Sequence, residues 1–64
     1  MFEYFKLYSH KRMLDAAILV LNSTKFKDGG YKLKVQWMNR RGMCLNITEN
    51  VTIKSEEVKN WYEI

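Results

Sequence analysis

Large apolar side chains alternate with polar ones along residues 31–38, and this alternation constrains the fold more than any other feature of the chain. Every odd position from Tyr31 to Trp37 is large and apolar, whereas the even positions are mostly polar. A period of two residues is typical of a β-strand with one buried face. Odd positions from Met43 to Ile53 largely continue the pattern. The sequence therefore predicts two strands whose odd-numbered side chains share a core.

The connection between these strands is predicted to be a three-residue loop, Arg40-Arg41-Gly42, closed by Asn39 and Met43. Such a loop uses a type I turn followed by a residue in the left-handed conformation, where glycine is favoured. A two-residue loop would mix the apolar and polar faces of the two strands. The pattern therefore favours the longer loop with its glycine in the third position.

The loop length also sets the register of the predicted hairpin. Trp37 is expected opposite Leu45, and Val35 opposite Ile47, so that apolar side chains of both strands lie on one face. Glu49 falls on that same face. We therefore expect a bulge or break at Glu49-Asn50.

Two further segments have helical spacing. Ser9 offers an N-cap oxygen, and apolar side chains in residues 10–22 recur three and four positions apart. Ser55 is a second candidate cap, followed by two glutamates that suit the positive end of a helix. Aromatic residues dominate residues 2–8 and predict a short strand. The predicted fold class is α+β: one β-α-β-β-α domain over residues 1–64, with helices packed on one face of an antiparallel, hairpin-containing sheet.

Composition limits what can stabilise this domain. Sixty-four residues form at most one domain. Cys44 and His10, the only cysteine and the only histidine, provide neither a disulfide framework nor a metal site, and we expect no cofactor. A hydrophobic share of 47% predicts a folded chain. A homodimer that completes its core across an interface is a second arrangement we consider.

Charge is distributed unevenly along the chain. Residues 1–42 carry nine basic and three acidic side chains, a net +6, whereas residues 43–64 have a net −2. A basic front part favours acidic partners. No segment has the length of a membrane span or the form of a signal peptide, and one unpaired cysteine suits a reducing interior. We expect a cytoplasmic protein without membrane contact.

The hairpin face opposite the predicted core is the leading candidate for a binding surface. A sheet that stacks nucleic-acid bases needs aromatic and cationic side chains on the same face. Here Trp37 is predicted on the covered face and the lysines on the other. We therefore predict a non-enzymatic inhibitor or adaptor that occludes an acidic or nucleic-acid-binding surface of a protein partner. The predicted contact residues are Lys32, Lys34, Gln36, Met38, Arg40 and Arg41.

Other roles are also compatible with the sequence. Direct DNA or RNA binding would use Lys25, Lys27, Lys32, Lys34, Arg40 and Arg41. A small anionic ligand could instead occupy a pocket at a dimer interface. His10-Lys11-Arg12 could bind an anion at a helix start, although exposed cations also suit a solvated surface. Cys44 lacks an identifiable base, no catalytic motif occurs, and we expect no enzymatic activity. Trp61 and Tyr62 are expected to fix the last helix to the sheet.

The stretch YKLKVQWMN and the segment from ITENVTIK to the C-terminal WYEI resemble small accessory proteins encoded by phages and mobile elements of low-GC Gram-positive bacteria. The resemblance covers roughly residues 31–64 and transfers no functional residue. It implies a short, non-enzymatic protein that binds and redirects a host component.

Overall fold

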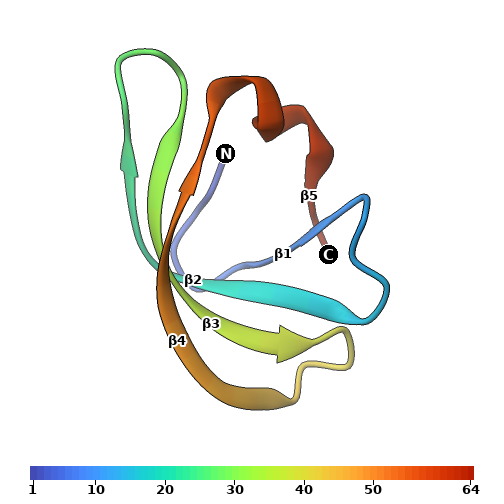
Figure 1. Cartoon of the computed structure of the whole chain (residues 1–64). Helices are drawn as coiled ribbons and strands as arrows, with labels where there is room; N and C mark the ends of the chain where they lie inside the picture. The colour runs from blue at the N-terminus through green and yellow to red at the C-terminus, as the bar shows by residue number, and fades with distance from the viewer.

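The computed structural model describes all residues, 1–64, as five antiparallel strands and one short 3-10 helix (Figure 1). The strands occur in the sheet order β4-β3-β2-β1-β5. The first four strands follow one another as a meander, and β5 returns beside β1. The elements are β1 (Leu7–His10), β2 (Ala16–Lys25), β3 (Tyr31–Asn39), β4 (Cys44–Ile53), η1 (Ser55–Asn60) and β5 (Trp61–Glu63).

The predicted α+β fold class is wrong, because the chain contains no α-helix. Residues 10–22 form the end of β1, a turn and most of β2. Leu14, placed on the apolar stripe of the predicted helix, is 93% exposed, whereas Ala17 and Ile18 are completely buried. Consecutive strand residues point to opposite faces, so β2 is covered on both sides at this point. A continuous apolar run is what such a central strand requires, and it imitates helical spacing.

The predicted C-terminal helix is also wrong. Ser55–Asn60 form a 3-10 helix, and no side chain caps its first turn. Val58 and Trp61 pack against the core, but Trp61 belongs to β5, so it anchors a strand rather than a helix. The expected strand over residues 2–8 begins later, at Leu7.

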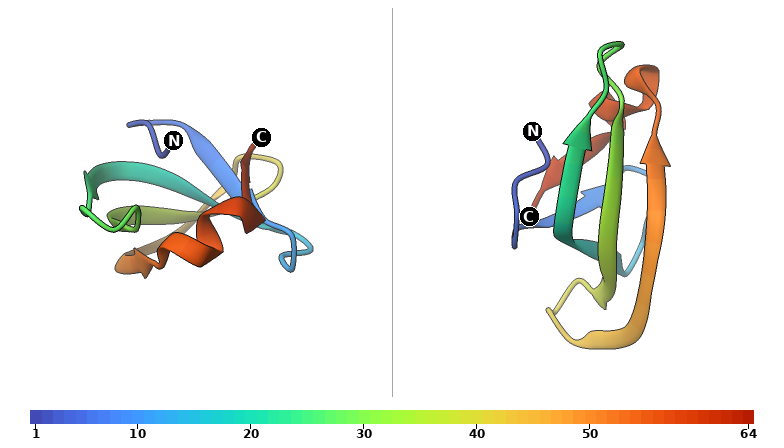
Figure 2. Two further views of the ribbon diagram at one scale, coloured as in Figure 1. Left: turned by 90° about the horizontal axis from the view of Figure 1, so that it is seen from above. Right: turned by 90° about the vertical axis from the view of Figure 1, so that its left-hand side faces the viewer.

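The core lies inside the curl of the sheet, beneath the N-terminal segment and η1 (Figures 1 and 2). The Phe2 ring contacts the rings of Tyr8 and Tyr31, with centroids 5.0 and 4.9 Å away. The Tyr8 hydroxyl donates to the Met1 carbonyl (2.5 Å) and accepts from the Glu3 N–H (2.8 Å), which holds the N-terminal segment in place. The buried cluster consists of Phe2, Tyr8, Ile18, Val20, Tyr31, Leu33, Val35 and Ile53.

The turn between β3 and β4 confirms the predicted three-residue loop. Gly42 has a φ of +84°, and the Asn39 N–H donates to the Met43 carbonyl over 2.9 Å. The first pair beyond the turn, Met38 with Cys44, is also in the expected register.

Beyond that pair the predicted register is wrong. The ladder resumes with Gln36 opposite Thr48, so Val35 lies opposite Glu49 instead of Ile47. The irregularity falls at residues 45–47, where Asn46 has a φ of +57°, and not at Glu49-Asn50 as expected. Three residues of β4 face one residue of β3 there, an offset of two that leaves odd and even faces unchanged.

The offset changes which odd-numbered side chains are buried. Leu33 and Val35 are fully buried, but the irregular segment carries Leu45 and Ile47 outward, to 47% and 51% exposure. Trp37 is half-buried and packs against the core. Its indole N–H donates to the Glu49 carboxylate over 3.2 Å, which gives that acid a partner on the apolar face.

Candidate functional site

The even-numbered side chains of β3 and β4 point away from the core and form a polar surface that we call the lysine face. Lys32 lies opposite Thr52, and Lys34 opposite Asn50. Both lysines are exposed, and none of the three ion pairs in the molecule involves them. They are therefore available to an external anionic group. The lysine face comprises Lys32, Lys34 and Gln36 of β3 with Thr48, Asn50 and Thr52 of β4.

A hollow of about 260 Å³ lies on this face between β2, β3 and β4. Its lining residues include two lysines, two asparagines and a threonine, whose side chains can donate hydrogen bonds to a carboxylate or a phosphate. No aromatic side chain is among its lining residues, but the exposed Tyr4 ring lies at its rim, where the Tyr4 hydroxyl donates to Asn22 Oδ1 over 2.8 Å. The lining residues are Asn22, Thr24, Lys32, Leu33, Lys34 and Asn50.

Gln36, another predicted contact residue, is held in a local network. The Thr48 hydroxyl donates to the Gln36 side-chain carbonyl over 2.9 Å. The Gln36 amide in turn donates to the Ile47 carbonyl over 3.2 Å. Gln36 therefore presents a fixed rather than a freely rotating side chain at the edge of the lysine face.

Met38 and Arg40 are engaged within the fold. Met38 is half-buried beside β2. The Arg40 guanidinium donates to Ser9 Oγ (3.2 Å), to the Met13 carbonyl (3.1 Å) and to the Tyr62 hydroxyl. Arg40 thus ties the β3–β4 turn to β1, to the turn after β1 and to β5. Its role in this structure is to join these elements.

The cations of the nucleic-acid alternative lie at opposite ends of β3. Lys25 and Lys27 lie at the β2–β3 connection, where Lys25 Nζ is 5.9 Å from the centre of the Tyr31 ring. Arg41 is exposed at the other end, next to Arg40. Nine strand residues span about 25–30 Å. The structure therefore does not bring the six cations together in one patch.

The outer edge of the sheet carries apolar side chains that the alternation assigned to the core. Met43 in the turn before β4, and Leu45 and Ile47 at the start of β4, are all exposed. β4 is the last strand in the sheet order, so one of its edges has no neighbouring strand. An apolar surface beside an unpaired strand edge is suited to contact with another polypeptide.

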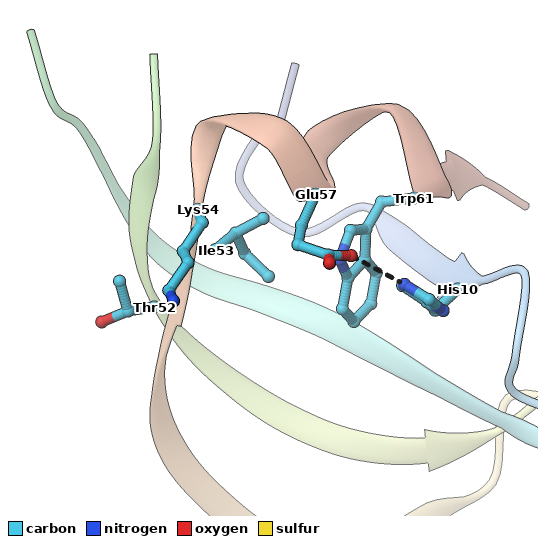
Figure 3. A pocket seen from close by; sticks show the side chains of 6 residues that line it. All are labelled: His10, Thr52, Ile53, Lys54, Glu57 and Trp61. Carbon is cyan, nitrogen blue, oxygen red and sulfur yellow. Dashed lines mark ion pairs between the residues drawn. The ribbon is translucent and has the colours of Figure 1, made fainter. Parts of the chain in front are cut away.

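A second hollow, of about 380 Å³, lies where η1 approaches β1 (Figure 3). Its wall includes the His10 ring, whose Nδ1 accepts the Arg12 N–H over 3.0 Å. The proton of the neutral ring is therefore on Nε2, which lies 3.6 Å from the Glu57 carboxylate. The Trp61 ring packs edge-on against His10, with centroids 5.1 Å apart. The lining residues are His10, Thr52, Ile53, Lys54, Glu57 and Trp61.

Sequence reasoning did not find this second hollow. It placed His10-Lys11-Arg12 at the start of a helix, but these residues end β1 and begin the following turn, so no helix start exists for an anion. His10 and Glu57 come together only because β5 pairs with β1 and brings η1 with it. No spacing of neighbouring residues in the sequence predicts this contact. The one available signal for a site at His10 is that it is the only histidine in the chain.

Hydrogen bonds from Asn60 and then from His10 lower the pKa of Glu57 below its ordinary value of 4.5. A carboxyl whose pKa is lowered by folding stabilises the protein above its unfolded pKa, and this contribution is lost as the pH falls through the folded value. We expect Glu57→Gln to lower the melting temperature at neutral pH, and the difference from the wild type to shrink below pH 4.5. Thermal unfolding followed by circular dichroism across this range measures it. Glu56→Gln is the control, because Glu56 bonds to neither His10 nor Asn60; a difference that stays constant with pH would contradict the assignment.

Cys44 is exposed on β4, and its sulfur accepts the Asn46 N–H over 3.3 Å. No three His, Cys, Asp or Glu side chains are grouped so that they could hold a metal ion. No helix has the length and apolar character to cross a membrane.

No family model, curated protein or solved structure matches this chain.

Proposed function

We propose that this chain is a small, cytoplasmic, non-enzymatic protein that places its lysine face against an acidic surface of a protein partner. By covering that surface it acts as an inhibitor or adaptor. The observation that carries the proposal is the pair Lys32 and Lys34, two cations without ion-pair partners, fixed two residues apart on the same face of a strand. Both lysines line a hollow whose other lining residues carry amide and hydroxyl groups.

Two further observations favour a protein over a nucleic acid as the partner. None of the six residues of the lysine face is aromatic, and Trp37 packs against the core on the other side of β3, so the strands themselves carry no ring for base stacking. The adjacent edge of β4 exposes Leu45 and Ile47, which suit an apolar contact. The resemblance to phage and mobile-element accessory proteins makes a host protein the expected partner.

The charge-reversal variant Lys32→Glu/Lys34→Glu is expected to lose this partner. Each exposed ion pair contributes about 0.2–1 kcal/mol, and reversal replaces attraction by repulsion, so binding should weaken about tenfold or more. We would use wild type and variant as bait in a lysate of a low-GC Gram-positive bacterium and quantify the bound proteins by mass spectrometry. A protein with an acidic surface should be recovered by the wild type and lost from the variant.

The matched control is Lys11→Glu/Lys59→Glu, which makes the same charge change at exposed positions outside the lysine face. It should retain the partner, because the site and not the net charge determines binding. Equal recovery with all three baits would contradict the proposal. Recovery of nucleic acid that is released as salt rises would favour the nucleic-acid alternative instead.

A further inference from the structure

The free edge of β4 is the longer of the two edges of the sheet. β4 has ten residues, whereas β5, at the other edge, has three. From Thr48 to Ile53, β4 pairs with β3 without interruption. We name this segment, Thr48–Ile53, the docking edge; six strand residues span about 20 Å. Such an edge offers unpaired backbone N–H and C=O groups to another strand.

The docking edge lacks the features that usually protect an edge strand. Natural sheets place lysines or prolines on exposed edges to prevent pairing with other chains. In β4 the only charged residue is Glu49, and the chain contains no proline. The irregular segment around Asn46 disturbs the edge only before Thr48. The docking edge is therefore open to strand addition from Thr48 to Val51, and its last two residues, Thr52 and Ile53, line the second hollow opposite Glu57 and Trp61.

The two faces beside the docking edge differ in chemistry. On one face Lys32 and Lys34 lie directly behind Thr52 and Asn50. The other face carries Glu49, whose carboxylate accepts from the Trp37 indole, half-buried Val51 and buried Ile53. Exposed Ile47 lies just before the docking edge. A strand added to β4 would lie two strand spacings, about 9–10 Å, from the backbone of β3. A lysine and a glutamate side chain extended toward each other bridge that distance.

We infer that the docking edge binds, by backbone pairing, an extended segment of the partner whose side chains alternate between acidic and apolar. The acidic side chains would face Lys32 and Lys34, and the apolar ones would lie beside Ile47 and Val51. In strand addition the backbone supplies affinity, and the side chains on alternate faces supply specificity. This inference rests on the proposed function, because the same lysines contact the partner, and it adds how the partner is held.

A second copy of this chain fits the docking edge less well. Pairing of β4 with another β4 brings only Thr, Asn and Cys side chains to the lysine face, and no acid. It also places two Glu49 carboxylates on the apolar side of the joined sheets. The charges therefore favour a different, acidic polypeptide over self-association.

Calorimetric titration with a short peptide that alternates glutamate with valine, blocked at both ends, tests the inference. The wild type should bind this peptide, and a peptide of the same composition with its glutamates grouped at one end should bind about tenfold more weakly. Only the alternating order separates the acids and the valines onto the two faces of a strand. Equal affinities for the two peptides, or no binding of the alternating one, would overturn the inference.

Two N-methylated forms of the alternating peptide separate backbone pairing from charge attraction. Methyl groups on the odd-numbered amides block one edge of the extended peptide, and methyl groups on the even-numbered amides block the other. Because β4 would bind one edge only, one form should lose about tenfold or more in affinity and the other should retain it. Equal effects of the two forms would contradict strand addition.

The outcomes distinguish this inference from the proposed function. If the peptide does not bind but the wild-type bait recovers an acidic protein that Lys32→Glu/Lys34→Glu loses, strand addition is wrong and the proposed function stands. If the bait recovers no such protein, the proposed function is wrong as well. A dimer seen by light scattering that the peptide neither binds nor dissociates would overturn the inference.

Discussion

Replacing Leu33 with alanine is expected to destabilise the fold by about 2–5 kcal/mol, the usual cost of emptying the site of a fully buried leucine. Leu33, the third residue of β3, is completely buried between Ser23 of β2 and Val51 of β4. Domains of this size have a total stability of only a few kcal/mol. Leu33→Ala should therefore unfold a large fraction of the protein at room temperature, measured by urea denaturation followed by tryptophan fluorescence.

Leu45→Ala is the matched control, because the alternation assigned both leucines to the same buried face. Leu45 is half exposed on the irregular segment of β4, and its truncation should change the free energy of unfolding by roughly 0.5 kcal/mol or less. Similar losses in the two variants would mean that β4 packs against the core along its whole length, contrary to the register described above.

Arg40→Ala is expected to lower the free energy of unfolding by about 1–2 kcal/mol, although Arg40 lies at a hairpin turn. Its guanidinium donates to Ser9, Met13 and Tyr62, and the substitution leaves these acceptors without that donor. Arg40→Lys should restore only part of the loss, because an ammonium group does not reproduce the planar guanidinium that lies over the Tyr62 ring, 5.7 Å from its centre. Denaturant titration of each variant measures the difference.

Arg41→Ala is the matched control for Arg40→Ala, because it removes the same charge from the same turn without removing hydrogen bonds of the side chain. The Arg41 side chain makes no hydrogen bond or ion pair, so Arg41→Ala should change stability by roughly 0.5 kcal/mol or less. Equal effects of Arg40→Ala and Arg41→Ala would show that the contacts of Arg40 add no stability. A loss of stability in Arg40→Ala alone would show that Arg40 has a structural role that Arg41 does not share, so the two adjacent arginines do not form one binding site.

The β3–β4 hairpin was the part of the fold that local sequence could predict. The alternation from Tyr31 onward identified the strand, and Gly42 identified the turn, because both depend on neighbouring residues. The register beyond the turn was not predictable in this way. β4 contains two extra residues at the irregular segment, where Asn46 has a left-handed conformation. This segment contains no glycine that would indicate such a conformation as clearly as Gly42 does.

The predicted helix over residues 10–22 failed because a strand buried on both faces has no period of two. Ala17 and Ile18 are both fully buried, so the apolar run satisfied a helical template equally well. Its β-branched Ile18 and Val20 were the available counter-signal. The prediction of an α-helix over the η1 segment was wrong for another reason. A segment of six residues can form a 3-10 helix, and residues suited to capping do not distinguish a 3-10 helix from a short α-helix.

The candidate site was predictable only where it depended on one hairpin. Lys32 and Lys34 lie on the outer face because they alternate with buried neighbours along β3. The engagement of Arg40 was not predictable, since its partners come from β1, the next turn and β5. The same holds for His10 and Glu57, which long-range pairing of β1 with β5 brings together.

The exposed thiol of Cys44 lies on the strand that carries the docking edge. Under air oxidation a disulfide between two such thiols would join two molecules covalently along this strand and would imitate self-association. Sedimentation and light-scattering measurements therefore require a reducing agent such as a phosphine. The same thiol is also a unique attachment point for a maleimide fluorophore, whose emission would report directly on a polypeptide that docks alongside.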